Sequence, residues 1–330
     1  MTAADTTDPT RRPRAPVPLL IDTDPGVDDA VALLLALASP EVRLLGVTAV
    51  FGNVAVGTAA ANAGRLLALA ERADVPVAAG AARPLRFPRV PRDPDRHHAD
   101  GLGGRADTLP PPAPPDPRGA VELLADTLRG ADRPVTLAAI GPLTNVARLL
   151  ADHPELAGRL GRIVVLGGRL ATHPGPDAEF NLTADPEAAH RVLAEASVPV
   201  TLVPLELTLR CAVPGGWLDE LAAAGPTCAT LAGLAAHRRA WARRHGGADG
   251  VPLHDAVAVL EAALPGTLRT EPRPLAVALS PAGERGAVRV AVRVAAGSGS
   301  RPVDVAVDLA PGLGVPGLHA ELLRRLRTLR

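Results

Sequence analysis

Four aspartates lie in the stretch DTDPGVDD, at positions 22, 24, 28 and 29. Two carboxylates about 4 Å apart repel each other by roughly 4 kcal/mol at an effective dielectric constant near 20. A helix cap needs only one or two of these side chains. A hard cation would relieve the repulsion, because Ca²⁺ prefers carboxylate and carbonyl oxygens. The stretch therefore indicates a metal site, for which Asp24, Asp29 and the distant Asp255 form a suitable set.

A metal beside an additional carboxylate can perform hydrolysis. The metal lowers the pKa of a bound water, and a neighbouring carboxylate accepts the proton. Asn53, Glu179 and Asn181 are suited to binding hydroxyl groups, so the pattern indicates a sugar-like ligand. The cysteines, Cys211 and Cys228, show no metal-type or redox-type spacing, and no Cys/His cluster suggests zinc.

Each residue also has a simpler structural explanation. Asp28 or Asp29 could cap a helix, and Asn145 could cap a helix or shape a turn. His254 could be an ordinary histidine at a helix start, and Glu179 a surface charge. Only the concentration of four aspartates on one turn argues against these explanations.

The elements that would position these residues alternate along the chain. Short apolar runs typical of buried strands alternate with longer helical patterns, which predicts a mainly parallel, Rossmann-like sheet flanked by helices. Ligands of such sheets lie at the carboxyl ends of the strands, where the polar residues fall. We expect strands over 17–22, 42–50, 134–140, 162–168 and 198–205, and helices over 28–38, 54–70, 118–129, 185–196, 217–245, 253–263 and 317–329.

The two ends of the chain differ from this pattern. Residues 1–16 resemble a disordered tail without a signal-peptide apolar region, and 17–330 are expected to form one catalytic domain. A Pro- and Arg-rich loop spans roughly 82–116. The segments PLAVAL, AVRVAVRV and PVDVAVDL alternate apolar and polar residues, which predicts additional half-exposed antiparallel strands near the C-terminus.

Composition excludes some classes of function. The 330 residues carry 35 basic and 35 acidic side chains, so the formal net charge is zero. This balance argues against binding to nucleic acid or to a membrane surface. The cysteine pattern and the absence of a signal peptide favour the cytoplasm.

The motifs together resemble the nucleoside hydrolases, the inosine-uridine preferring nucleoside N-ribohydrolases. The similarity begins at DTDPGVDDAVALLLAL and extends to the C-terminus. It continues in order through VTAVFGNV, HHADGLGG, AAIGPLTNVARLL, RIVVLGG, AEFNLTADPEAAHRVL and PLHDAVAVL. The resemblance implies a single-domain fold, Ca²⁺ at the bottom of a ribose pocket, hydrolysis of ribonucleosides to base and ribose, and a homodimer or homotetramer.

The resemblance also implies roles for individual residues. Asp24 would act as general base and metal ligand, and His254 as the acid that protonates the leaving base in pyrimidine-preferring or non-specific members. The other metal ligands would be Asp29, Asp255 and the carbonyl of Ile140. The substrate would contact Asp28, Asn53, His97, Leu166, His173, Glu179, Asn181 and His254, while Asp22 would support the turn.

Three departures from the family pattern leave alternatives open. His173 falls nearest a position that usually holds an Asn for the 5′-hydroxyl, Leu166 replaces a frequent Met, and His97-His98 replaces His-Gly. These changes keep a modified substrate or a ribose-binding pseudoenzyme as alternatives. An aspartyl phosphatase is disfavoured, because the chain lacks the lysine that such enzymes need.

Overall fold

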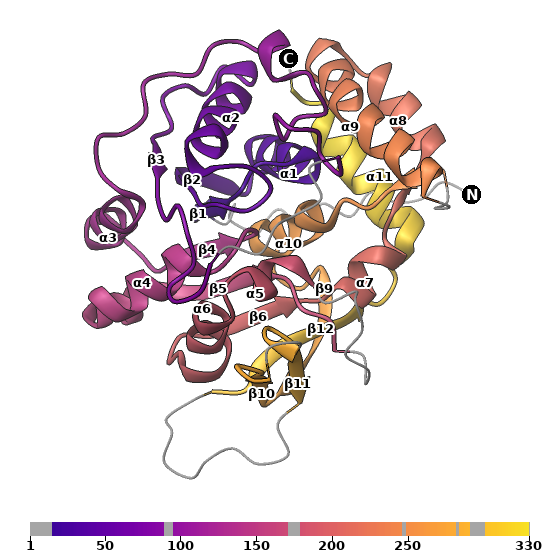
Figure 1. Ribbon diagram of the computed structural model, residues 1–330. Coiled ribbons are helices and arrows are strands. Elements are labelled where there is room, and N and C mark those ends of the chain that lie inside the picture. Colours follow the sequence, from indigo (N-terminus) through magenta and orange to yellow (C-terminus); the bar gives the residue numbers. More distant parts are fainter. Residues whose placement is uncertain are drawn as a thin grey trace.

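The computed structural model describes residues 15–88, 95–170, 179–245, 249–281, 284–290 and 301–329. Within these residues, eight strands form one sheet in the order β3-β2-β1-β4-β5-β6-β12-β9 (Figure 1). The strands are β1 (Val17–Thr23), β2 (Val42–Ala49), β3 (Val77–Ala79), β4 (Val135–Ala139), β5 (Leu160–Leu166), β6 (Val200–Val203), β9 (Leu268–Arg273) and β12 (Val303–Leu309).

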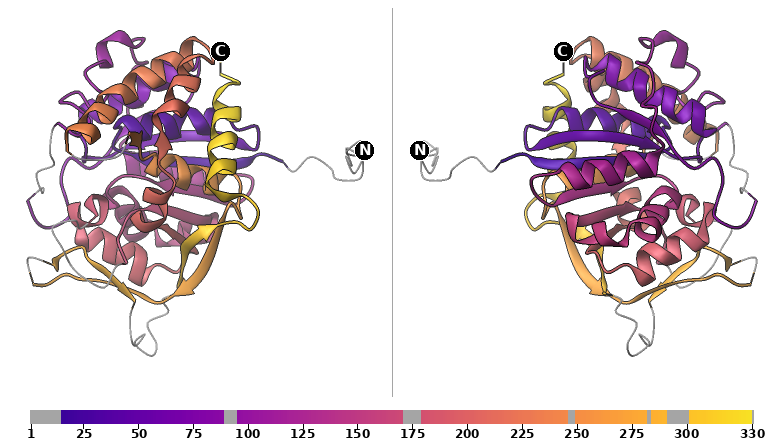
Figure 2. Two further views of the ribbon diagram at one scale, coloured as in Figure 1. Left: turned by 90° about the vertical axis from the view of Figure 1, so that its right-hand side faces the viewer. Right: turned by 90° about the vertical axis from the view of Figure 1, so that its left-hand side faces the viewer.

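The sheet is parallel except at one edge. Neighbouring strands from β3 to β12 run in the same direction, whereas β9 pairs antiparallel with β12. The residues of β1 after Val17 are all buried, as expected for a parallel strand covered on both faces. In Figure 2 the orange and yellow strands β9 and β12 lie toward the opposite end of the sheet from the indigo β1.

Helices cover both faces of the sheet. One apolar core packs side chains of α1 (Val27–Leu37), α2 (Val56–Leu69), α8 (Gly215–Ala222), α9 (Pro226–Arg244), α10 (His254–Ala263) and α11 (Gly314–Leu326) against it. A second core on the other face contains α3 (Ala120–Gly130), α4 (Thr144–Asp152) and α6 (Pro186–His190). None of these helices combines the length and the apolar composition that a bilayer crossing requires.

The remaining elements are short. They comprise α5 (Phe180–Ala184), α7 (Leu205–Arg210), the 3₁₀ turns Ala106–Thr108 and Pro154–Arg159, the π-helical turn Arg191–Glu195, and the two-stranded pairs β7 (Val213–Pro214) with β8 (Gly250–Val251) and β10 (Leu275–Val277) with β11 (Val288–Val290).

The predicted α/β class with a mainly parallel sheet is confirmed. Of the predicted C-terminal strands, β10 and β11 pair antiparallel as expected, whereas the third differs from the prediction. The segment over 302–309 was expected to be antiparallel and half-exposed. Instead, β12 lies inside the main sheet, parallel to β6 and antiparallel only to β9. Alternation shows which face is buried but does not reveal the partner strand. Sequence reasoning also missed β3, β9, α4, α5 and α7, which are short or lack clear periodicity. The predicted tail lies mostly in residues 1–14, outside the described residues.

Candidate active site

A cavity of about 410 Å³ opens at the carboxyl ends of the parallel strands. Because β1, β2, β4, β5 and β6 run in the same direction, the residues that follow them meet at one edge of the sheet. The lining residues are Asp24, Asp28, Asp29, Asn53, Arg96, Ile140, Leu166, Arg169, Glu179, Phe180, Asn181, Leu205, Leu209, Arg238, His254 and Asp255. Ten of them were predicted from the sequence.

The turn between β1 and α1 brings its aspartates to one place. Asp29 Oδ2 accepts a hydrogen bond from Gly26 N (2.8 Å), and Asp29 Oδ1 accepts one from Thr23 Oγ1 (2.5 Å). A Cβ atom at Gly26 would lie 2.7 Å from both His97 Nδ1 and Asn53 Nδ2, so this position needs glycine. Asp29 therefore caps the start of α1 while its side chain also borders the cavity.

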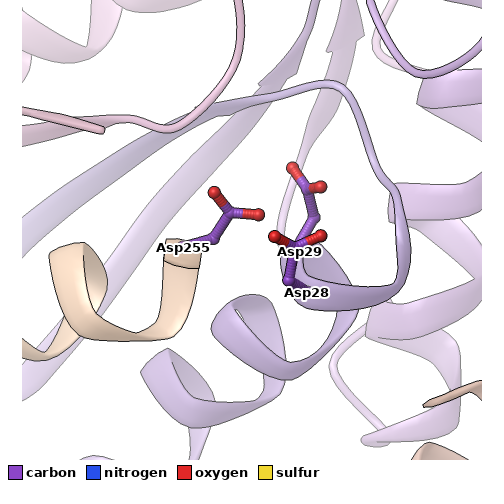
Figure 3. Close-up of side chains that lie close together, drawn as sticks. All are labelled: Asp28, Asp29 and Asp255. Carbon is purple, nitrogen blue, oxygen red and sulfur yellow. The ribbon is translucent and has the colours of Figure 1, made fainter. Parts of the chain in front are cut away.

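Three carboxylates form an acidic cluster across two helices. Among the described residues, Asp28, Asp29 and Asp255 each place one ligand atom within 4.8 Å of the others. Figure 3 shows Asp255, at the start of α10, facing the two aspartates of α1. Burial, followed by the charge of Asp28, raises the pKa of Asp29 above its usual value. The same two causes, with further repulsion from Asp29 and Asp24, hold the pKa of Asp255 well above its usual range.

The cluster fits a metal ion by its chemistry. The charges of Asp28 and Asp29, which raise the pKa of Asp255, would be stabilised by a cation, and all three residues offer oxygen. The side-chain oxygen Oδ1 of Asn53, which also lines the cavity, is buried and has no hydrogen-bond partner among the described residues. The grouping differs from the predicted ligand set, since it contains Asp28 where the sequence indicated Asp24. The roles of Asp24 and of the Ile140 carbonyl as metal ligands stay predictions.

Asp24 is held by the chain that follows β2. Its Oδ2 accepts a hydrogen bond from Asn53 N at 2.6 Å, and the side chain is 1% exposed. A Cβ atom on Gly52 would overlap with this carboxylate, and one on Gly141 would lie 2.9 Å from Asp24 Oδ1. Two glycines thus make the space in which Asp24 sits against the cavity.

Asp22 stabilises the sheet rather than the turn. Its Oδ1 accepts hydrogen bonds from Thr48 Oγ1 (2.5 Å) and Asn145 Nδ2 (2.8 Å). Burial raises the pKa of Asp22 to about 7, against the effect of these hydrogen bonds. Asn145 also donates to Ala49 O (3.0 Å) and accepts from Ala81 N (2.9 Å). The Asn145 side chain therefore cross-links three segments, a role that the sequence interpretation as a cap or turn did not foresee.

The opposite wall carries the residues predicted to bind the sugar. Asn181 Nδ2 donates to Ile140 O at 2.8 Å, which leaves Asn181 Oδ1 for other partners. The Glu179 carboxylate accepts from the backbone nitrogens of Gly168, Asn181 and Leu182 at 2.7–3.0 Å. Glu179 therefore caps α5 and is buried, so it is not the surface charge of the simpler explanation. Leu166, the last residue of β5, adds an apolar contact surface.

His254 stands at the first turn of α10, next to Asp255. Its Nδ1 lies 2.7 Å from Thr208 Oγ1, a hydroxyl of α7 that is fully buried. Thr208 also contacts Leu205 O at 3.4 Å. Sequence reasoning missed Thr208, because a threonine in LELTL carries no signal by itself.

Of the two other predicted histidines, His97 is not among the described residues that line this cavity. His97 Nδ1 accepts a hydrogen bond from Val27 N (3.2 Å) and lies 3.9 Å from Asp28 Oδ1. His97 is 5% exposed and stands behind Asp28, outside the lining formed by the described residues. His173 falls within 171–178 and lies outside the described residues. Their contacts with substrate stay predictions.

Three arginines at the cavity were not predicted as site residues. Arg96 and Arg238 both lie over the ring of Trp241, at 5.2 Å and 4.5 Å, and Arg169 follows β5. Arg96 had been noted only as part of the Arg-rich loop. Every basic residue of the chain is arginine, so an arginine at the site does not stand out in the sequence.

The fold and this site define a nucleoside hydrolase. The chain belongs to the inosine-uridine preferring nucleoside hydrolase family, whose model matches residues 19–311. It is therefore a nucleoside N-ribohydrolase, as the sequence resemblance predicted.

Particular relatives add detail. The chain is 41% identical over 248 residues to a pyrimidine-specific ribonucleoside hydrolase, RihA, of Klebsiella pneumoniae, covering 72% of this chain and 77% of that protein. Among solved structures, a plant nucleoside hydrolase, PpNRh1, superposes with a TM-score of 0.86 at 29% identity, over 94% of this chain and 99% of that one. A purine-preferring ribonucleoside hydrolase from Gardnerella vaginalis gives 0.85 at 27% identity, over 94% and 98%.

Proposed function

We propose that this enzyme hydrolyses ribonucleosides in a Ca²⁺-dependent reaction with a preference for pyrimidine bases. The observation that carries the proposal is the acidic cluster of the half-buried Asp28 and the buried Asp29 and Asp255, in a cavity that His254 also lines. The identity to a pyrimidine-specific hydrolase supports the base preference. The purine-preferring structural neighbour shows that the fold alone does not fix this preference.

The acidic wall suits the charge of the reaction. Loss of the base leaves an oxocarbenium-like ribosyl cation, which nearby carboxylates stabilise. A bound Ca²⁺, held by Asp29 and Asp255 with Asp24 and the Ile140 carbonyl, would orient the ribose and lower the pKa of the attacking water. Asp28, Asn53, Glu179 and Asn181 would hold the ribose hydroxyls by hydrogen bonds, with His97 and His173 toward the base and 5′ ends.

Two proton transfers accompany cleavage of the bond. The water oxygen attacks C1′ while Asp24 accepts the water proton. The C1′–N bond breaks, its electron pair goes to the base nitrogen, and His254 donates a proton to the departing base. His254 lines the same cavity as Asp24, so acid and base can act on one bound nucleoside.

A nucleoside panel tests the proposal. Ribose release from uridine, cytidine, inosine, guanosine and adenosine would be measured with Ca²⁺ and with a chelator. We expect the largest kcat/KM for a pyrimidine nucleoside, loss of activity in chelator, and recovery with Ca²⁺. Asp24→Asn should lower kcat by roughly 10²- to 10⁴-fold, the usual contribution of a general base. Faster turnover of purines would overturn the base preference, and activity unaffected by chelator would overturn the Ca²⁺ requirement.

A substrate with an anionic substituent is a second candidate, favoured by the three arginines at the cavity. Guanidinium groups bind carboxylate and phosphate in a bidentate way. Uridine, its 5′-monophosphate and a pyrimidine nucleoside with a carboxylate on the ring would be compared. A higher kcat/KM for either anion would support this candidate, and binding of all nucleosides without turnover would instead indicate a pseudoenzyme.

We also propose a cytoplasmic homodimer or homotetramer. The mass measured by sedimentation equilibrium would test the assembly, and a monomer at micromolar concentration would contradict it.

A further inference from the structure

We propose that Thr208 is a positioning residue that fixes the orientation of His254, so that Nε2 is the ring nitrogen that donates a proton to the leaving base. This inference rests on the proposed role of His254 as the acid. It adds a residue from a different element, α7, to the arrangement at the start of α10.

The contact between the two side chains is short and buried. Thr208 Oγ1 lies 2.7 Å from His254 Nδ1, and Thr208 has no exposed surface. A hydroxyl buried without a hydrogen bond destabilises a protein by about 1–3 kcal/mol. The shorter contact of this hydroxyl is the one with the imidazole, since Leu205 O lies 3.4 Å away, and the hydroxyl can either donate to Nδ1 or accept from it.

The surrounding elements hold Thr208 in place. Leu205 and Leu209, on the same short helix, line the cavity, whereas Thr208 lies behind them. Leu205 N donates to Gly168 O at 3.0 Å, which joins the start of α7 to the loop after β5. The backbone of α7, and with it Thr208, is therefore held by the loop after β5 in addition to its packing against α10.

The consequence concerns which nitrogen can reach the substrate. With Nδ1 engaged by Thr208, a proton passed to the base comes from Nε2, which carries one when the Thr208 hydroxyl donates to Nδ1 or when the ring is doubly protonated. A ring that rotates away loses the donor geometry, and a displacement of about 1 Å can cost roughly 100-fold in rate. Thr208 acts through the histidine, so its loss should affect the proton donation step and not the binding of ribose.

The test compares Thr208→Val, which keeps the shape, with Thr208→Ser, which keeps the hydroxyl. Each variant would be assayed with the best natural nucleoside and with p-nitrophenyl riboside, whose leaving group needs no protonation. We expect Thr208→Val to lower kcat for the nucleoside by about 10- to 100-fold. KM should stay within about twofold, the nitrophenyl riboside should be hydrolysed normally, and Thr208→Ser should retain most activity.

Two results would overturn the inference. One is an equal loss with both substrates, which a general structural defect would cause. The other is full activity of Thr208→Val with the natural nucleoside. The ¹⁵N shift of His254 Nδ1 provides a readout that needs no turnover, and it should change in Thr208→Val but not in Thr208→Ser. An inactive wild-type enzyme would contradict the proposed function, while an unchanged Nδ1 shift in Thr208→Val would contradict the positioning role.

Discussion

The four aspartates of the DTDPGVDD stretch have different surroundings, although they look equivalent in sequence. Asp22 cross-links strands through Thr48 and Asn145, and Asp24 is held by the backbone of Asn53. Asp28 and Asp29 face Asp255 across the cavity. One residue type thus has three roles: it stabilises the fold, it provides the candidate general base, and it forms the candidate metal site. The surroundings of each aspartate determine which role it has.

At the scale of single residues, a substitution of Gly52 tests the placement of Asp24. A Cβ atom at position 52 would overlap with the Asp24 carboxylate, so Gly52→Ala should displace the proposed base. We expect kcat to fall by roughly 100-fold, as for a misplaced catalytic group. Steady-state ribose release provides the measurement.

Gly57→Ala is the matched control. Gly57 is exposed in α2, and nothing lies within 4 Å of a Cβ atom there. Alanine at this position should leave kcat unchanged and stabilise the protein by about 0.5–1 kcal/mol. Normal activity of Gly52→Ala would contradict the tight placement of Asp24.

At the scale of elements, α11 is joined to the chain that precedes β2 by a buried arginine. Arg325 is 2% exposed, and its guanidinium donates to Glu41 Oε2 at 2.6 Å and to Glu321 Oε1 at 2.7 Å. The hydrogen bond from Arg324, followed by those from Arg325, lowers the pKa of Glu321 to about 2. Because two carboxylates pair with one buried cation, the C-terminal helix is held to the chain that precedes β2.

This network predicts a pH-dependent stability. A carboxyl whose pKa is lowered by folding stabilises the protein fully above its unfolded pKa, here near 4.5. That stabilisation is lost as the pH falls toward 2. Glu321→Gln should therefore lower the free energy of unfolding by about 1.5–3 kcal/mol at pH 7, and the difference from wild type should shrink below pH 4.5.

Urea unfolding at pH 7 and pH 3 would measure this difference. Glu220→Gln is the control, since Glu220 pairs with Arg327 at 3.6 Å on the surface and should contribute less than about 1 kcal/mol. A deficit for Glu321→Gln that is equal at both pH values would contradict the electrostatic explanation.

For the whole molecule, the cavity couples metal binding to stability. Asp29 lies on α1 and Asp255 on α10, two helices that pack in one core, so a shared cation would hold them together. Ligand at 100 times its Kd stabilises a folded protein by about 2.7 kcal/mol. The wild-type enzyme should therefore show a Tm several degrees higher in Ca²⁺ than in chelator.

Asp255→Asn removes one of the like charges. In chelator this variant should be at least as stable as wild type, because repulsion within the cluster is relieved. Added Ca²⁺ should raise its Tm little. Asp132→Asn, a change at an exposed ion pair, should keep the full Ca²⁺ shift. Differential scanning calorimetry would measure these Tm values. A Ca²⁺-induced rise in Tm as large in Asp255→Asn as in wild type would argue against Asp255 as a metal ligand.

The sequence by itself determined five strands of the parallel sheet (β1, β2, β4, β5 and β6), most of the longer helices, the buried character of β1, and ten of the residues that line the cavity. The strands follow from local periodicity, and the polar residues at one edge follow from the rule that parallel strands present their carboxyl ends together. Ile140 and Leu166 were assigned to the site only through the family resemblance. The family motifs added the class of enzyme. Such signals are local in the chain, so they can be read without knowing which segments meet.

Only the tertiary structure decided the pairings between distant segments. The grouping of Asp28 with Asp29 and Asp255, the place of His97 behind Asp28, and the contact of Thr208 with His254 each join segments far apart in sequence. The position of β12 between β6 and β9 is of the same kind. These contacts depend on how whole helices and strands pack together. The type of a single residue does not indicate which distant residue it will contact.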